Sequence, residues 1–365
     1  MQMDSGKEVG GIKRADRSSS RWAIFRWSLI LLLTLELFVR SSVMLLPKYE
    51  YKPGWGLVPV ENSVSVQGKE GFGVTRYLED GEIWTPYRDG DHIVVLGDST
   101  VKAAQVNDTD NFVSLAEMAL RRRGLAIDLH NFGASERAVS DHVYIAPMLI
   151  SKFQPRFVVI QVSLASFVLS MSEAHDNHFV VESDGSLTLV HREPDQDALR
   201  LKNALYSSGL LSLIDYRWQM VRPTLTLSQE GFVAKAAEQP VVAADGGDAH
   251  ISFELLSAQV RAIQDAYQDV PVIFLIVPYT PAIYPETPYE LSWNSGNDNI
   301  LAIGLNNIDG VHVVVVREEF QQVYNKRLVL PRGSFNSLFN FGHLNRDGHR
   351  VVSFVLTRAL EGLLK

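Results

Sequence analysis

The chain has 365 residues, with 34 Lys and Arg against 42 Asp and Glu, so its net charge is −8. A hydrophobic share of 46% and a charged share of 21% are typical of a globular protein, and the acidic balance argues against a nucleic-acid partner, since phosphate binding needs a basic face. The sequence contains no cysteine, which excludes disulfides, thiolate catalysis and thiolate metal sites.

Residues 22–46 (WAIFRWSLILLLTLELFVRSSVMLL) predict a single transmembrane helix. The 20 residues from Trp27 to Leu46 suffice for one bilayer crossing. Glu36 and Arg40 interrupt the apolar run, but they are four positions apart, so they share a helix face and can pair. No small-x-small cleavage site follows, which favours a retained anchor over a cleaved signal peptide or a buried core helix.

The basic residues around this span predict its orientation. Six precede the span and three follow its core, which favours a cytoplasmic amino terminus. They are Lys7, Lys13, Arg14, Arg17, Arg21 and Arg26 before it, and Arg40, Lys48 and Lys52 after it. We therefore expect a cytoplasmic tail at 1–21, a signal-anchor at 22–46 and a main domain in the periplasm or at the cell surface.

Residues 47–90 are rich in turn signals (KPGWG, QGKEGFG, EDGE, RDGD) and are expected to form an irregular approach segment. Five strand-like segments follow, and three of them are continuous apolar runs, as in strands covered on both faces. They are 92–97 (HIVVLG), 127–132 (IDLHNF), 156–163 (RFVVIQVS), 271–277 (PVIFLIV) and 311–316 (VHVVVV).

Amphipathic helices are expected at 111–123, 253–267 and 346–364. Strands alternating with helices, with crossovers of a dozen or more residues, predict an α/β fold over 91–365, in which helices sandwich a five-stranded parallel sheet. The stretch from 164 to 270 is too long for one crossover, so an insertion is expected at about 170–250.

Two short motifs carry candidate catalytic groups. The first strand ends in Gly97-Asp98-Ser99, and the carboxyl edge of a parallel sheet is where sites usually form. His343, in NFGHLN, immediately precedes the last helix and is the type of base that a serine nucleophile needs. Taken singly, an ordinary turn and a polar helix-start residue are the alternative interpretations.

Together, these motifs resemble the SGNH (GDSL) hydrolases, in particular membrane-anchored bacterial members, over roughly 88–170 and 270–365. The resemblance implies a three-layer fold with a five-stranded parallel sheet, a serine nucleophile, and a late Asp and His that complete a triad. It also implies an oxyanion hole made of the serine N–H, a glycine N–H from a second sequence block and an asparagine side chain from a third. Members cleave esters, often acyl or acetyl groups on glycans and lipids.

Carried over by this resemblance, Ser99 matches the nucleophile and His343 the base. The triad Asp, three residues before the His, is replaced by Asn340, which can still orient the ring through its carbonyl. In a serine protease the same exchange costs about 10⁴ in rate, because the amide favours the wrong histidine tautomer.

The oxyanion blocks also depart from the family pattern. Block two falls in 131–136, where Gly133 is present but Glu136 replaces the second glycine, whose N–H usually binds the oxyanion. The block-three asparagine falls near Ala165, so Ser163 or Ser166 would have to supply a hydroxyl instead. Losing one such donor typically costs about 10²–10³ in rate.

Other motifs provide weaker evidence of a functional site. Residues 175–178 (HDNH) include metal-ligand types, but a polar loop is the favoured interpretation. No phosphate-cradling glycine motif follows a strand, so the sequence does not support a nucleotide cofactor. We expect no cofactor and no metal.

Three hypotheses for the function follow. The first is a membrane-anchored, extracytoplasmic serine ester hydrolase acting on acyl or acetyl esters of envelope glycans. The second, motivated by the three replaced positions, is a non-catalytic module of the same fold that binds glycan or assembles a complex. The third is an acyltransferase that uses the same Ser and His, and the sequence cannot separate it from the first.

Overall fold

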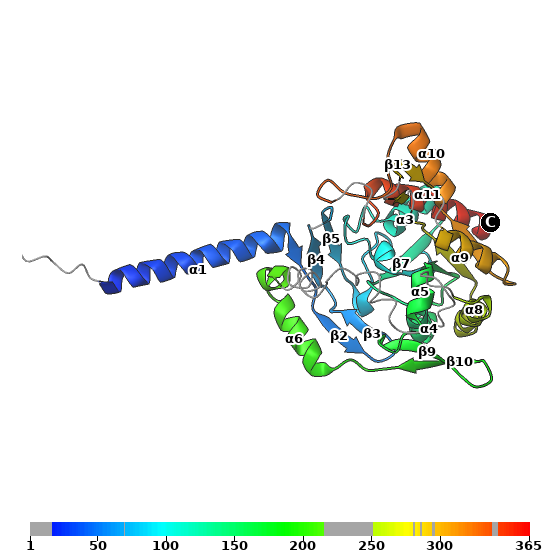
Figure 1. Ribbon diagram of the computed structural model, residues 1–365, viewed down its shortest axis with the longest axis horizontal. Helices are drawn as coiled ribbons and strands as arrows, with labels where there is room; N and C mark the ends of the chain where they lie inside the picture. The colour runs from blue at the N-terminus through cyan, green and yellow to red at the C-terminus, as the bar shows by residue number, and fades with distance from the viewer. Residues whose placement is uncertain are drawn as a thin grey trace, which may run out of the picture.

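The computed structural model describes residues 17–68, 70–214, 251–279, 282–284, 287–293, 296–337 and 342–365. Its centre is a five-stranded sheet with the strand order β14-β11-β8-β6-β7 (Figure 1). Every neighbouring pair in it is parallel. The predicted parallel sheet is therefore confirmed. Its strands are β6 (Asp91–Gly97), β7 (Ile127–Gly133), β8 (Phe157–Val162), β11 (Val272–Ile276) and β14 (His312–Val315).

Helices cover both faces of this sheet, because its strands are apolar on both sides. In β6, Val94 and Leu96 belong to one core and Ile93 and Val95 to the other. The three predicted helices are confirmed. The first core is covered by α4 (Val139–Phe153), α5 (Leu164–Leu169), α8 (Phe253–Tyr267) and α9 (Gly296–Asn306), and the second by α3 (Phe112–Arg122), α10 (Arg317–Arg327) and α11 (Arg346–Leu364).

Residues 47–90 differ from the irregular segment expected. Two of the four turn signals mark connections between short strands, and a third, EDGE, falls on a 3-10 turn. KPGWG spans the turn of the antiparallel hairpin β2–β3, and QGKEGFG joins β4 to β5. The elements are β1 (Met44–Leu45), β2 (Tyr49–Lys52), β3 (Gly56–Pro59), β4 (Val64–Gln67), β5 (Gly73–Arg76) and the 3-10 turn η1 (Glu79–Gly81).

The long stretch between β8 and β11 carries additional elements. An antiparallel hairpin of β9 (Asn177–Val181) and β10 (Leu187–His191) is followed by α6 (Gln196–Tyr206). Both lie on the same side of the domain as β2 and β3 (Figure 1). The remainder of the expected insertion, 215–250, lies outside the described residues. A further antiparallel pair, β12 (Ala282–Tyr284) and β13 (Thr287–Ser292), precedes α9.

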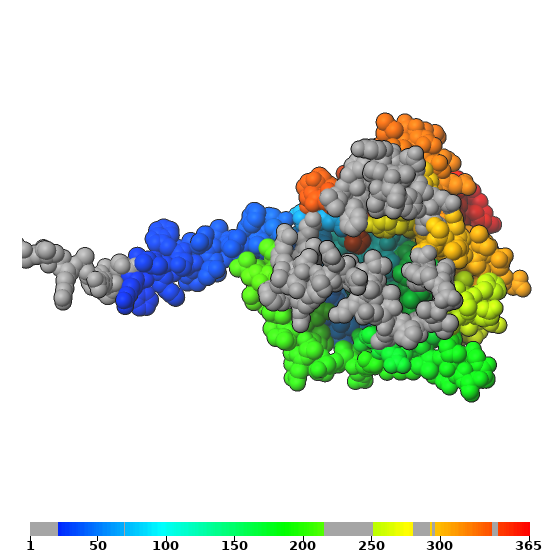
Figure 2. All heavy atoms as spheres, viewed as in Figure 1, coloured from blue at the N-terminus to red at the C-terminus, as the bar shows by residue number. Residues whose placement is uncertain are grey.

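The first helix, α1 (Arg17–Ser42), projects from the domain as a rod (Figures 1 and 2). Large apolar side chains from Trp22 to Phe38 are exposed along it. Its segment Arg21–Ser42 is long and apolar enough to cross a membrane, a property that a signal sequence shares.

The domain end of α1 is bonded to the chain just after α6. Glu36 and Arg40 form the pair that their spacing predicts, with 2.6 Å between Oε1 and Nε. The Glu36 carboxylate also accepts hydrogen bonds from the Ser208 hydroxyl (2.8 Å) and from the backbone N–H groups of Gly209 (2.8 Å) and Leu210 (2.9 Å). Polar contacts therefore join this part of the helix to the domain.

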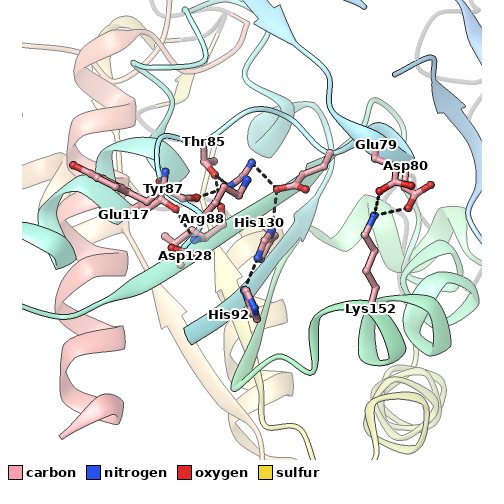
Figure 3. A network of polar contacts seen from close by, with 12 residues as sticks. Glu79, Asp80, Thr85, Tyr87, Arg88, His92, Glu117, Asp128, His130 and Lys152 are labelled. Carbon is pink, nitrogen blue, oxygen red and sulfur yellow. Dashed lines mark hydrogen bonds and ion pairs between the residues drawn. The ribbon is translucent and has the colours of Figure 1, made fainter. Parts of the chain in front are cut away.

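A polar network ties the segment after η1 to the sheet (Figure 3). His92 Nδ1 lies 2.9 Å from His130 Nε2, and His130 Nδ1 lies 2.9 Å from a carboxylate oxygen of Glu82. Arg88 pairs with the same carboxylate at 3.0 Å. The network therefore spans β6, β7 and the outer segment.

Glu117 of α3 lies beside this network and is fully buried (Figure 3). Its carboxyl oxygens accept hydrogen bonds from the backbone N–H groups of Leu129 (2.8 Å) and Tyr87 (3.3 Å). Burial raises the pKa of Glu117 to about 8. The side chain is therefore mostly protonated at neutral pH.

Candidate active site

Ser99 is presented at the carboxyl end of strand β6, which lies between β8 and β7 in the sheet. It is the first residue of the short helix α2 (Ser99–Lys102). Asp98 caps this helix by accepting a hydrogen bond from the Thr100 N–H at 2.7 Å. The Asp98 N–H in turn donates to Oε1 of Gln161 on β8, at 3.1 Å. The GDS sequence is thus a capped turn held between two neighbouring strands.

His343 reaches Ser99 from the other end of the chain. Its Nε2 lies 3.0 Å from Ser99 Oγ. It stands two residues before the N-cap of α11, Asn345, whose Oδ1 accepts the N–H groups of Asp347 and Gly348. The Nδ2 of Asn345 donates to three carbonyls of the preceding loop, in residues 330–333. Asn345 therefore bonds both to the first turn of α11 and to the loop before it, and these contacts hold the chain next to His343.

The second ring nitrogen of His343 bonds to Glu70, a residue that the sequence analysis did not name. His343 Nδ1 lies 2.8 Å from Glu70 Oε2. The backbone N–H of His343 also donates to Glu70 Oε1. Glu70 lies in the turn between β4 and β5. Asn340, which was expected to orient the ring, lies outside the described residues.

Asn336 holds the turn that carries Glu70. Its Nδ2 donates to the carbonyls of Gly68 (2.8 Å) and Gly71 (3.0 Å). Its Oδ1 accepts the N–H of Gly71 at 2.6 Å. A single amide side chain therefore brackets Glu70 on both sides.

Gly342 allows the Glu70 carboxylate to approach His343. Its φ is +89°, and a Cβ at this position would collide with the Glu70 carboxylate. Its N–H donates to the Tyr279 hydroxyl at 2.8 Å, and its carbonyl accepts from Arg332 at 3.1 Å. The guanidinium of Arg332, which is buried, also lies 4.1 Å from the centre of the Tyr279 ring.

The electrostatics favour an ionised Glu70. Burial raises its pKa, but the hydrogen bonds from His343 and the charges of His343 and Arg332 outweigh burial, so the pKa is lowered. An ionised carboxylate accepts a hydrogen bond from Nδ1–H and so holds the proton on Nδ1, which leaves Nε2 of a neutral imidazole free to accept the Ser99 hydroxyl proton. This is the arrangement that activates a serine.

The structure places the block-two residues in different environments. The Gly133 N–H donates to Asn131 Oδ1 at 2.9 Å and is therefore already engaged. A side chain at Gly133 would collide with the backbone of α2, so this glycine allows β7 and α2 to pack together. Glu136 has a left-handed backbone, with φ of 58°, a conformation that glycine adopts readily.

The two block-three serines form a reciprocal cap at the start of α5. The Ser163 hydroxyl accepts the Ser166 N–H at 3.3 Å, and the Ser166 hydroxyl accepts the Ser163 N–H at 3.1 Å. The Ser166 hydroxyl donates its proton to the Ser163 carbonyl at 2.7 Å. Of the two hydroxyls, Ser163 thus keeps a proton to donate elsewhere.

The remaining polar motifs have structural partners. His349 is buried and stacks on Phe112, with ring centres 5.9 Å apart, and burial lowers the pKa of His349 to about 3. In the HDNH motif, His175 bonds to Asp141 at 2.7 Å. The last two residues of the motif begin β9. Within the described part of the chain, no group of three or more His, Asp or Glu side chains is placed to hold a metal ion.

The functional candidates missed by the sequence analysis are Glu70, Asn336 and Arg332. Each lies in a loop without periodicity, and each is identified by contacts between distant parts of the chain. The nearest available signal was the acidic residue inside the glycine-rich turn QGKEGFG.

Comparisons with known proteins find similarity among solved structures alone, since no family model and no curated protein matches the chain. The esterase EstA from Pseudoalteromonas sp. is 12% identical and covers 75% of this chain and 98% of its own, with a TM-score of 0.34. The acetyl xylan esterase AlAXEase is 14% identical, and the match covers 73% of this chain and 98% of the esterase, with a TM-score of 0.36. A catalytic mutant of Axe2, an acetylxylan esterase from Geobacillus stearothermophilus, is 11% identical. The match covers 74% of this chain and 94% of the Axe2 chain, with a TM-score of 0.39. Similarity this low leaves the function to be argued from the chain's own residues.

Proposed function

We propose that this protein is a serine ester hydrolase in which Ser99 is the nucleophile, His343 the base and Glu70 the carboxylate that orients the base. The observation that carries the proposal is the continuous hydrogen-bonded series from Ser99 Oγ to His343 Nε2 (3.0 Å) and from His343 Nδ1 to Glu70 Oε2 (2.8 Å). A nucleophile, a base and an orienting carboxylate in this order are the recognisable geometry of serine hydrolysis.

In the proposed reaction, Ser99 Oγ attacks the ester carbonyl carbon while His343 Nε2 takes its proton. Glu70 stabilises the imidazolium that forms. The tetrahedral intermediate collapses, and His343 gives the proton to the departing alcohol, which leaves an acyl group on Ser99. Water then attacks this acyl group, with His343 again acting first as base and then as acid, and the carboxylic acid departs.

The negative charge on the tetrahedral oxygen needs hydrogen-bond donors. The N–H of Ser99, as the first residue of α2, has no acceptor within its helix. We assign it to the oxyanion, together with the N–H of Glu136, whose left-handed backbone suits the position of the usual glycine. The Ser163 hydroxyl is the candidate third donor, because its proton is not used by the cap.

Glu70 also bears on the non-catalytic alternative. That hypothesis was motivated by three replaced positions, one of which is an asparagine where the family has an aspartate. An ionised carboxylate on His343 Nδ1 supplies the countercharge that Asn340 lacks, and so supports catalysis.

The setting and substrate class are part of the proposal. The exposed apolar surface of α1 and the excess of basic residues before it support a single membrane crossing with the main domain outside the cytoplasm. An acyl or acetyl ester on an envelope glycan is the substrate class that the resemblance implies for an enzyme in this position.

The test is labelling of the detergent-solubilised full chain with a fluorophosphonate, which reacts with activated serines. We expect labelling of the wild type, loss of it in Ser99→Ala and His343→Ala, and strong slowing in Glu70→Gln. Ser186→Ala, which alters an exposed serine in the β9–β10 turn, is the matched control and should label normally. Equal labelling of the wild type and Ser99→Ala would overturn the proposal.

A further inference from the structure

A cavity of about 350 Å³ lies beside the candidate active site. Its walls come from the hairpin β2–β3, the loop 133–137, the β9–β10 region and α6. None of the motifs used in the proposed reaction explains the charged and aromatic side chains that line it.

The cavity shares a wall with the surroundings of Ser99. Lys102, which lines the cavity, ends the same four-residue helix that Ser99 begins. Glu136, whose N–H we assign to the oxyanion, lines it too. The loop is fixed to the strand of the nucleophile, since the Ala134 N–H donates to the Gly97 carbonyl at 3.1 Å. A ligand in the cavity would therefore extend toward the reacting ester.

Four cations line the cavity without forming an ion pair with any described carboxylate: Lys102, Arg137, Arg192 and Lys202. Lys102 Nζ donates to the Ser135 hydroxyl at 3.3 Å. Arg137 donates to the Phe132 carbonyl at 3.3 Å. Lys202 Nζ lies 5.1 Å from the centre of the Tyr49 ring, and Arg192 donates to the Glu173 carbonyl at 2.9 Å. The charge of Arg137 also acts on the carboxylate of Asp141, so the charges available to a ligand are those of Lys102, Arg192 and Lys202.

The acidic side chains of the same cavity compensate for only part of this charge. Asp80 is paired with Lys52 (3.1 Å) and Lys152 (2.8 Å), and Asp141 is bonded to His175 (2.7 Å). With Asp141 set against Arg137 and the histidines counted as neutral, three cations, Lys102, Arg192 and Lys202, face two acids, Glu136 and Asp176. The balance is 3 − 2, an excess of one positive charge in a protein whose net charge is −8.

Aromatic rings accompany these charges. Tyr49 and Tyr51 are half-buried on the cavity wall. Asn203 fixes the backbone of Tyr49 through bonds of 2.8 and 2.7 Å, and the Tyr51 hydroxyl lies 2.8 Å from His191 Nε2. Held aromatic surfaces combined with a few directed polar groups are typical of sites for small polar ligands, including sugar rings.

We propose that this cavity binds an anionic sugar unit of the glycan whose ester reacts at Ser99. The inference rests on the proposed function and adds a charge requirement to its substrate class. Lys102 and Lys202 would bind the carboxylate or phosphate of that unit, and the tyrosines would contact its ring. Neutral glycans would lack the charge contacts and bind more weakly.

The experiment is equilibrium binding to the full chain in detergent, with three probes: tri-galacturonate, glucose 6-phosphate and neutral cellotriose. We expect the anionic probes to bind at least about tenfold more tightly than cellotriose, with an affinity that falls as salt is added. A preference for tri-galacturonate would assign a carboxylate as the anion, and a preference for glucose 6-phosphate would assign a phosphate.

Single substitutions locate the site. Lys102→Ala and Lys202→Ala should each weaken anion binding by about tenfold or more, since each removes a charged contact. Lys326→Ala, which removes an exposed lysine of α10 away from the cavity, is the matched control and should bind as the wild type does. Equal affinity of the wild type for charged and neutral probes, or no effect of either cavity variant, would overturn the inference.

Hydrolysis of 4-nitrophenyl acetate by the wild type separates this inference from the proposed function. This small neutral ester needs no glycan contacts. Ser99-dependent hydrolysis without anion binding would reject the cavity proposal and leave the esterase proposal standing. Anion binding that depends on Lys102 and Lys202, in a protein that neither hydrolyses the ester nor reacts with fluorophosphonate, would reject the esterase proposal instead.

Discussion

Glu70 Oε2 lies 2.8 Å from His343 Nδ1, although 273 positions separate the two residues in the chain. The carboxylate therefore comes from the segment before the first strand of the sheet, and the chain order of the three groups is Glu, Ser, His. The same Glu70 side chain also bonds to the His343 backbone N–H, so one residue fixes both the ring and the loop that carries it.

Glu70→Gln tests this assignment. The amide keeps the size of the side chain but removes the negative charge and can favour the wrong histidine tautomer, so we expect kcat for 4-nitrophenyl acetate to fall by about 10³–10⁴. Glu61→Gln, at an exposed position in the same segment, is the control and should keep full activity. A loss of less than tenfold in Glu70→Gln would show that Glu70 does not serve the reaction.

Asn336→Ala should act through the position of Glu70. Without the amide, the turn loses three hydrogen bonds that hold Gly68 and Gly71. A misplacement of about 1 Å in a catalytic group can cost about 10² in rate, so we expect kcat to fall by about that factor while KM changes little. The measurement is steady-state kinetics on the same ester, with a thermal unfolding curve to establish that the variant is folded. Unchanged kcat would contradict the assignment.

Gly342→Ala should damage the site sterically. The methyl group would meet the Glu70 carboxylate, and a left-handed φ of +89° is unfavourable for alanine. We expect a stability loss of about 1–2 kcal/mol and a fall in kcat of about 10² or more from displacement of the carboxylate. Gly362→Ala, a helical position in α11 with open space around it, provides the comparison. Wild-type kinetics in Gly342→Ala would show that the Glu70–His343 contact tolerates the displacement.

Glu117 predicts a pH dependence of stability. Burial raises its pKa from 4.5 to about 8 in the folded protein, so the folded state keeps a proton that the unfolded state loses. The stability associated with this group is fully present below pH 4.5 and declines as pH rises toward 8. At about 1.4 kcal/mol per pKa unit, the loss is at most about 5 kcal/mol. Glu117→Gln removes the titration, and its carbonyl can still accept the Leu129 N–H.

Urea unfolding at several pH values checks this prediction. The wild type should lose stability between about pH 4.5 and 8, and Glu117→Gln should lose less over the same range. Asp128 of the same region has a lowered pKa, because the hydrogen bonds from the Gly90 N–H and Arg121 outweigh its burial, so its own contribution changes at lower pH. Parallel pH profiles of the wild type and Glu117→Gln would contradict the assignment.

The sheet and its helices could be predicted from sequence because their signals are local. The continuous apolar run of β11 and the helical spacing of apolar residues in α11 follow from burial against neighbouring layers. The pairing of Glu36 with Arg40 was equally local. Residues 47–90 were predicted less well, because their strands are four residues or shorter and their turns are more conspicuous than their apolar pattern.

The residues of the candidate site also fall into those that sequence could predict and those that it could not. Ser99 and His343 stand at the ends of regular elements, so their positions could be inferred from the topology of the sheet. Glu70 occupies a turn that is placed by Asn336, and neither residue shows a pattern along the chain that marks it. The contact depends on packing between segments far apart in sequence, which periodicity does not report.

For the proposed membrane-anchored esterase, the polar contacts of Glu36 limit where the folded domain can act. Arg21–Ser42 has 22 residues, which at about 1.5 Å per residue gives a rod about 33 Å long. Its last turns, from Glu36 on, are bonded to residues 208–210, so they are joined directly to the folded domain and not through a flexible linker. The depth of the folded domain, rather than the length of a linker, then sets how far from the lipid surface an ester can be reached. Glycan chains would have to approach the membrane to react, and esters on distant layers of the envelope would be spared.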